Sequence, residues 1–187
     1  MSVTEQYFLD RNKAVLVVID VQEKLCRAMD EKVLAQLVAN TGILQEAARE
    51  LGLPMLATEQ YVKGLGETLP ALRENLGEPA IEKMTFSCCG ESPFPDRLKS
   101  LGRKQVIVTG METHVCVLQT VLELLEAGYV VHLVQDAVMS RRKANWQAAI
   151  ETARGAGAVI TTTEAALFQL LKVAGSDEFK KLSKLVR

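Results

Sequence analysis

The sequence has few histidines, few aromatic residues and almost no excess of charge of either sign. Its 187 residues include two histidines, 5% aromatic residues and a formal net charge of −1. So balanced a charge gives no reason to expect a nucleic-acid partner or an acidic membrane surface. With two histidines and no Asp-x-His pair, the sequence also gives poor support for a metal site. We therefore expect no metal and no other cofactor, and a small molecule as the partner.

The four cysteines stand at positions 26, 88, 89 and 116, a spacing that fits neither a disulfide framework nor a zinc site. No apolar run reaches the roughly 18 residues that span a bilayer. The first ten residues lack the basic stretch and the apolar core of a signal peptide. These absences predict a protein of the reducing cytoplasm that has no membrane partner.

Apolar runs and helical periodicity alternate along the chain. The run Ala14–Ile19 is continuously apolar, which is typical of a strand buried on both faces of a parallel sheet. Residues 105–110 show the same pattern, and helical spacing of apolar residues is present at 30–51 and 113–127. This alternation predicts an α/β fold of three αβα layers, Rossmann-like, with a parallel sheet of about six strands. The length suits a single domain over residues 1–187.

Charged and nucleophilic side chains stand where the predicted strands end. They are Asp20 after the first strand, Lys83 at the end of a short strand, Cys116 in the helix after residues 105–110, and Asp136 near the end of a strand at 129–134. Ligands of an open parallel sheet bind at this edge, so we expect these groups to share one cleft. Each also has an ordinary interpretation, as a turn aspartate, a surface lysine or a buried structural cysteine. They indicate catalysis only as a set.

Cys116 is the strongest candidate for a nucleophile. Thr113 is a suitable helix N-cap, which places Cys116 in the first turn of the predicted helix. Free amides and the helix dipole favour a thiolate there. A lysine cation nearby would lower the pKa of the thiol further. His114 lies about 200° around the helix from Cys116, which argues against a Cys–His dyad.

Two other features have structural interpretations. His132 lies inside an apolar strand, and we interpret it as a core histidine whose hydrogen bonds are satisfied. Cys88 and Cys89 form a vicinal pair, which we interpret as loop cysteines near the rim of a pocket. A redox pair is the alternative for these two thiols.

Together these residues resemble the isochorismatase-like superfamily of cysteine hydrolases, over residues 13–172. The matching stretches are Val17-Val18-Ile19-Asp20 with Gln22, Glu82-Lys83, Gly110-Met111-Glu112-Thr113-His114-Val115-Cys116-Val117 and Asp136-Ala137-Val138-Met139-Ser140-Arg141. The stretch Thr58-Glu59-Gln60-Tyr61 with Lys63-Gly64-Leu65-Gly66 resembles the branch of isochorismatase-domain-containing proteins.

The resemblance implies a catalytic triad of Asp20, Lys83 and Cys116. In this triad the cysteine is the nucleophile, the aspartate takes its proton and the lysine assists. The resemblance also implies a cis peptide bond before the active helix, here Met111–Glu112. The backbone amides of Glu112 and Cys116 would then be directed at a developing oxyanion.

Two departures from the family narrow the expected reaction. True isochorismatases lack the nucleophilic cysteine. Nicotinamidases bind a metal through a histidine in the segment after the second strand, where this chain has Glu59, Gln60 and Tyr61. We therefore expect hydrolysis of a small amide, or of a related acyl compound, through a thioester.

The expected substrate pocket is lined by Gln22, Tyr61, Phe86 and Met111, with an ordinary core position as the alternative for the last three. We also expect the chain to form a homo-oligomer. Two other functions stay open at this point. One is a hydrolase of an N-carbamoyl group or an ester, and the other is an oligomeric interaction protein with weak catalysis.

Overall fold

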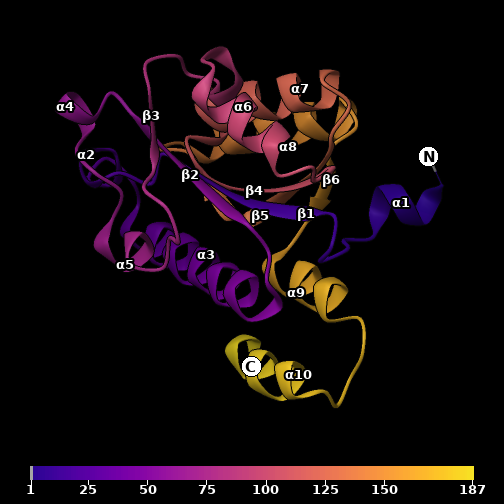
Figure 1. Ribbon diagram of the computed structural model, residues 1–187. Helices are drawn as coiled ribbons and strands as arrows, with labels where there is room; N and C mark the ends of the chain where they lie inside the picture. Colours follow the sequence, from indigo (N-terminus) through magenta and orange to yellow (C-terminus); the bar gives the residue numbers. More distant parts are fainter. Residues whose placement is uncertain (1) are drawn as a thin grey trace.

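The computed structural model describes residues 2–187 and places helices on both faces of one parallel sheet (Figure 1). The strands are β1 (Ala14–Ile19), β2 (Met55–Gln60), β3 (Ile81–Lys83), β4 (Gln105–Met111), β5 (Val130–Met139) and β6 (Val159–Thr161). Their order across the sheet is β3-β2-β1-β4-β5-β6, and every pairing is parallel. The predicted three-layer fold with a six-stranded parallel sheet is confirmed.

Most of the helices and helical turns are short. They are α1 (Val3–Tyr7), α2 (Glu23–Cys26), α3 (Glu31–Leu51), α4 (Val62–Leu65), α5 (Pro70–Arg73), the 3-10 turn η1 (Cys88–Gly90), α6 (Pro93–Ser100), the π-helical turn η2 (Thr113–Val117), α7 (Leu118–Glu126), α8 (Lys143–Gly155), α9 (Thr163–Leu171), α10 (Asp177–Leu182) and the 3-10 turn η3 (Ser183–Val186). Within residues 2–187, no helix has the length and apolar character that crossing a membrane requires.

The core consists of two apolar layers, one on each face of the sheet. Successive side chains of β1 alternate between them, since Leu16 and Val18 pack toward α3 and α9, whereas Val17 and Ile19 pack toward α6, α7 and α8. All six residues of β1 are buried. A strand covered on both faces is apolar at every position, which is why its sequence is not amphipathic.

The longest helix, α3, has clear start and stop signals. The Asp30 carboxylate accepts hydrogen bonds from the amides of Lys32 and Val33, at 3.0 and 3.1 Å. At the other end Gly52 adopts a φ of 69°, the left-handed conformation that suits glycine after a helix. This helix returns the chain to the start of β2, so that β2 joins β1 in parallel.

Two predicted boundaries were wrong, and both concern the carboxyl edge of the sheet. Strand β5 continues to Met139, so Asp136 lies within the strand, and its carboxylate accepts from the amide and hydroxyl of Thr163 at 2.9 and 3.0 Å. Asp136 therefore fixes the start of α9 and does not join the other edge residues. The predicted helix at 113–127 is divided into η2 and α7. Its N-cap is Glu112, and the hydroxyl of Thr113 has no hydrogen-bond partner in residues 2–187.

Candidate active site

Asp20 stands at the centre of the carboxyl edge because β1 lies between β2 and β4. The last residue of β1, Ile19, is in register with Thr58 of β2 and with Gly110 of β4. Gly110 has a φ of 117°, and a Cβ atom there would lie 2.0 Å from the Ile19 carbonyl oxygen. Only glycine allows β4 to approach β1 this closely. The close approach brings the chain that follows β4 to the side of Asp20.

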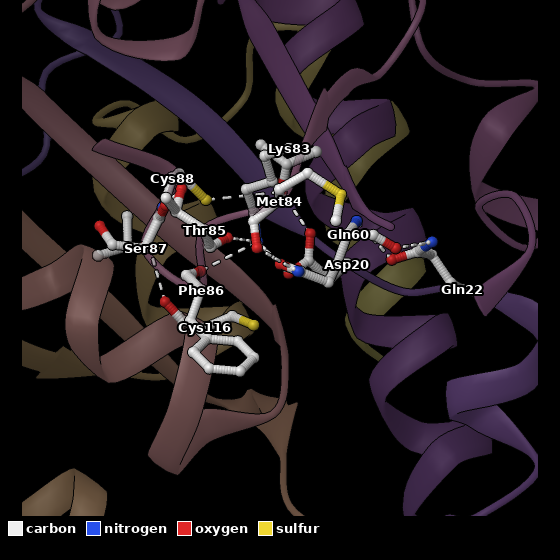
Figure 2. A network of polar contacts seen from close by, with 12 residues as sticks. Asp20, Gln22, Gln60, Lys83, Met84, Thr85, Phe86, Ser87, Cys88 and Cys116 are labelled. Atoms are coloured by element: carbon white, nitrogen blue, oxygen red, sulfur yellow. Dashed lines mark hydrogen bonds and ion pairs between the residues drawn. The ribbon is translucent and has the colours of Figure 1, made fainter. Parts of the chain in front are cut away.

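A buried ion pair joins Asp20 and Lys83 (Figure 2). The Lys83 Nζ lies 2.7 Å from the Asp20 Oδ2, and the side chains are 2% and 0% exposed. The hydroxyl of Thr58 donates to the other carboxylate oxygen of Asp20 at 2.8 Å. Asp20 itself has a φ of 50°, in the left-handed region that non-glycine residues seldom adopt. The carboxylate is therefore held by charge and by a hydrogen bond, with no contact to bulk water.

The ammonium of Lys83 has three more acceptors around it. They are the Gln60 Oε1 at 2.8 Å and the carbonyl oxygens of Thr85 and Phe86 at 3.2 and 3.0 Å (Figure 2). A buried cation needs such partners because its desolvation is costly. These bonds also fix the loop after β3 against the end of β2.

Gln22 belongs to the support of this pair and does not line an open pocket. It has no exposed surface, and its side chain donates to the carbonyls of Gln60 and Gly66 at 2.9 and 2.6 Å and accepts from the Gln60 amide at 2.7 Å. The Gln60 side chain in turn donates to the Met84 carbonyl at 2.8 Å. The expectation that Gln22 contacts substrate is corrected accordingly, since all of its polar atoms are engaged with the backbone.

Cys116 lies in η2 and is 5% exposed. The Glu112 carbonyl accepts from the Val117 amide at 3.3 Å, which gives the turn its wide, π-helical form. The Thr120 hydroxyl donates to the Cys116 carbonyl at 2.7 Å and accepts from the Cys88 amide at 2.9 Å. One side chain of α7 thus holds both the cysteine turn and the loop after β3.

The thiol of Cys116 is not a preformed thiolate, contrary to the expectation from its place in the turn. Burial raises its pKa, and the Asp20 carboxylate raises it further by its negative charge and by accepting a hydrogen bond. Lys83 acts in the opposite direction and is outweighed. The thiol therefore keeps its proton at neutral pH until a base removes it.

The other three thiols are also free and uncharged at neutral pH. Burial raises the pKa of Cys26 and Cys89 to about 11 and that of Cys88 to about 12. Cys88 was expected near a pocket rim, but it is 1% exposed, and its sulfur lies 3.5 Å from the Thr58 hydroxyl. Cys88 therefore lies in the core, whereas Cys89 is partly exposed.

Glu112 joins the cysteine turn to the segment after β5. The peptide bond Met111–Glu112 is cis, the bond at which the resemblance implies it. The Glu112 carboxylate is almost entirely buried and accepts from the Arg141 amide at 2.9 Å and from the Arg141 Nε at 3.1 Å. The role of the Glu112 and Cys116 amides toward an oxyanion stays a prediction.

The other expected pocket residues occupy different surroundings. Tyr61 and Phe86 are about half exposed, and Tyr61 lines a cavity of about 400 Å³ together with Lys83 and Met84. Met111 has no exposed surface, so it belongs to the core beneath the site and not to an open wall. Cys116 is not among the residues that line this cavity.

The two histidines lie away from the thiol. His114 contacts the Ser140 hydroxyl at 3.0 Å and the Asn145 amide at 3.3 Å, so no Cys–His dyad forms. His132 is buried as expected, and the Gln6 backbone lies close enough to its ring to raise its pKa, although no contact of its ring nitrogens within residues 2–187 has the full geometry of a hydrogen bond. The same residues contain no group of three or more His, Cys, Asp or Glu side chains that could hold a metal ion.

Residues 14–165 match the family model described as Isochorismatase domain. The chain is 40% identical over 183 residues to the secreted isochorismatase effector Isc1 of Phytophthora sojae, and the match covers 94% of this chain and 85% of that protein. It is 38% identical over 179 residues to isochorismatase domain-containing protein 2 of Danio rerio, with 95% and 89% covered.

Solved structures agree with these sequence matches. The MAR1 ribonuclease from Caenorhabditis elegans has a TM-score of 0.89 and 39% identity, over 96% of this chain and 92% of that chain. YcaC from Pseudomonas aeruginosa, solved with hexane-2,5-diol and covalent acrylamide, has a TM-score of 0.89 and 26% identity, over 95% and 91% of the two chains.

Proposed function

Because the chain belongs to the isochorismatase family, we propose that it is a cysteine hydrolase that cleaves a small amide through a thioester. Asp20, Lys83 and Cys116 form its catalytic triad. The observation that carries this proposal is the buried Asp20–Lys83 ion pair of 2.7 Å beside a buried thiol whose pKa the same carboxylate raises. A charged pair kept out of water next to a thiol is costly to maintain for stability alone.

The first half of the reaction forms the acyl-enzyme. Asp20 takes the thiol proton as the Cys116 sulfur attacks the carbonyl carbon of the amide. The backbone amides of Glu112 and Cys116 donate to the oxyanion of the tetrahedral intermediate. The C–N bond then breaks, and the amine leaves with the proton that Asp20 received.

The second half restores the enzyme. Asp20 takes a proton from a water molecule, which attacks the thioester carbonyl, and the new tetrahedral intermediate expels the Cys116 sulfur. The proton returns to the thiol and the carboxylic acid is released. Lys83 keeps Asp20 in position by a short ion pair.

A small amide is favoured over the other acyl compounds on chemical grounds. The Asp20 carboxylate can return its proton to a leaving nitrogen, which an amide needs more than an ester does because an amine leaves poorly as an anion. Hydrolysis of an N-carbamoyl group or an ester stays as the alternative on the same triad.

A ribonuclease is a second candidate because of the name of the related Caenorhabditis elegans protein. The net charge of −1 gives little attraction for a polyanion.

We also propose that the chain is cytoplasmic and forms a homo-oligomer. Light scattering on the purified protein tests the oligomeric state independently of activity. An interaction protein with weak catalysis is the remaining alternative.

The test is a panel of small primary amides, N-carbamoyl compounds, esters and single-stranded RNA, with ammonia and acid release measured together. We expect equal amounts of ammonia and acid from at least one amide, and no turnover by Cys116→Ala. Cys26→Ala is the matched control and should keep its activity. Amide turnover by the Cys116→Ala protein would overturn the proposal, and so would RNA cleavage by that variant.

A further inference from the structure

A second ion pair, between Glu112 and Arg141, lies at the start of η2, the turn that carries Cys116. The Glu112 side chain is 7% exposed, whereas Arg141 is 58% exposed and lines a cavity of about 660 Å³ beside β5. The carboxylate accepts from the Arg141 amide at 2.9 Å and from the Nε at 3.1 and 3.2 Å. No other hydrogen bond to this carboxylate is found among residues 2–187.

Glu112 also stands at the start of η2, the turn that carries Cys116. It is the N-cap residue of η2, and its carbonyl accepts from the amides of Val115 and Val117 at 3.0 and 3.3 Å. The N-cap makes no side-chain hydrogen bond to the turn, since its carboxylate points to Arg141 instead. The Glu112 side chain therefore joins the start of η2 to Arg141, which lies two residues after the end of β5 at Met139.

We propose that Glu112 and Arg141 are positioning residues that set the orientation of the Cys116 turn and keep a negative charge near the thiol neutralised. The proposal rests on the proposed function, in which Cys116 is the nucleophile. Neither side chain touches the reacting atoms in this scheme. They act through the backbone of residues 112–117, which carries both the nucleophile and the amides assigned to the oxyanion.

Because the Glu112 carboxylate is charged and buried, it needs a cationic partner as well as a hydrogen-bond donor. Glu112 precedes Cys116 by four residues, and a negative charge near a thiol favours the protonated form. The carboxylate that acts on Cys116, Asp20, is paired with Lys83. Arg141 pairs with the Glu112 carboxylate in the same way. If the arginine is lost, Glu112 becomes a buried charge with no cationic partner, which is more harmful than the loss of both groups.

This reasoning predicts a specific pattern in three variants. Arg141→Gln should lower kcat by about tenfold or more with little change in KM, and should shift the pH profile of Cys116 alkylation to higher pH. Glu112→Gln keeps an acceptor for the Arg141 amide and removes the charge, so its loss should be smaller. The double variant Glu112→Gln, Arg141→Gln should be more active than Arg141→Gln alone, because it leaves no unpaired buried carboxylate.

Arg142→Gln is the matched control. Arg142 is the next residue, it is exposed, and it forms no ion pair within the described part of the chain, residues 2–187. The alkylation profile must be recorded for each variant beside its Tm, so that a general loss of folding is separated from a shift at the thiol. Asp20, Lys83 and Cys88 are the titratable groups whose charges act on Cys116, and all of them are unchanged in these variants.

The outcome is decided by alkylation as well as by turnover. If wild-type Cys116 alkylates no faster than the other thiols, the proposed function itself fails. If wild type behaves as proposed but Arg141→Gln matches Arg142→Gln in kcat and in alkylation profile, the positioning role is wrong. The positioning role is also wrong if the loss of kcat in the double variant, expressed as a free energy, equals the sum of the losses in the two single variants.

Discussion

At the scale of single residues, the proposed reaction requires the resting thiol of Cys116 to be activated during catalysis and not before it. Its pKa is raised by burial and by Asp20, which outweigh the Lys83 cation. A carboxylate that raises the pKa of a thiol is also the group placed to accept its proton. The contribution of Lys83 is therefore to hold Asp20 in place. Its ammonium is itself fixed by four acceptors, of which Asp20 is one.

This view predicts that losses at Asp20 and Lys83 are not additive. Asp20→Asn and Lys83→Met should each abolish most turnover, and each should lower the free energy of unfolding by about 3–5 kcal/mol because one partner stays buried without the other. The double variant should be little worse in kcat/KM than either single one, since the two groups act as a unit. Kinetics and chemical denaturation of the three variants measure both effects.

Lys99→Met is the control for the loss of a lysine, since Lys99 is exposed on α6 and forms no ion pair within residues 2–187. It should leave kcat/KM and stability almost unchanged. Simple additivity of the Asp20 and Lys83 losses would show that the lysine acts independently of the aspartate.

His132 gives a prediction for the dependence of stability on pH. Burial lowers its pKa to about 4 from 6.5. The folded protein thus binds a proton at His132 less readily than the unfolded chain does. The stability that comes with a neutral His132 is therefore present above pH 6.5 and is lost as the pH falls toward 4. Between pH 7 and 5 the free energy of unfolding should fall by about 2 kcal/mol from this residue.

The measurement is urea denaturation of wild type and His132→Leu at both pH values. The variant removes the titrating group, so the decrease between pH 7 and 5 should be smaller by about the same amount. Equal decreases in the two proteins would show that His132 is accessible to protons in the folded state.

At the scale of elements, β1, β4 and α3 could be predicted because their signals are local. A continuous apolar run, helical spacing and a glycine stop are readable from the sequence alone. The end of β5 and the division of residues 113–126 into η2 and α7 could not be predicted. Asp136 is polar but stays in its strand because it bonds Thr163, a residue distant in the sequence. The π-helical turn likewise depends on which carbonyl receives the Val117 amide.

Gly110 is the position where the packing of two elements is most constrained. In Gly110→Ala the new Cβ would meet the Ile19 backbone at 2.0 Å, with φ at 117°. We expect a loss of about 2–5 kcal/mol in stability and a loss of activity, because β4 must move away from the strand that carries Asp20.

Gly42→Ala in the middle of α3 is the matched change, since nothing lies within 4 Å of the new Cβ. It should be neutral or stabilising by up to about 1 kcal/mol. Thermal denaturation of both variants compares them directly. A Tm for Gly110→Ala equal to that of wild type would contradict the close approach of β1 and β4.

At the scale of the whole molecule, the site is assembled from residues of β1, β2, β3 and the turn after β4. The meeting of Asp20 and Lys83 could be predicted because each stands at the end of a strand and the edge of a parallel sheet gathers strand ends. Thr58, Gln60 and Thr120 were missed, although each makes hydrogen bonds that hold the site. All three are buried polar side chains, and the partner of such a side chain is fixed by the order of the elements in the fold and not by sequence spacing.

The arrangement also predicts that activity does not depend on a metal. In the segment where a metal would be expected, the Glu59 carboxylate already accepts from the Thr68 amide and hydroxyl at 2.6 and 2.7 Å. No histidine is present between residues 59 and 63. Prolonged treatment with EDTA and with 1,10-phenanthroline should leave kcat/KM unchanged. A zinc or iron content that follows activity during removal and re-addition would overturn this prediction.

The most direct test of the central claim is competitive labelling of the four thiols with acrylamide at pH 7, followed by mass spectrometry of the tryptic peptides. Ranking by pKa alone would favour Cys26 and Cys89, at about 11, over Cys116. The account predicts the opposite, because Asp20 removes the proton of Cys116 as it attacks. Cys116 should be labelled first in wild type and should lose that priority in Asp20→Asn. Labelling of Cys26 or Cys89 ahead of Cys116 in wild type, or an Asp20→Asn protein with an unchanged order, would contradict the claim that Cys116 is the nucleophile and Asp20 its base.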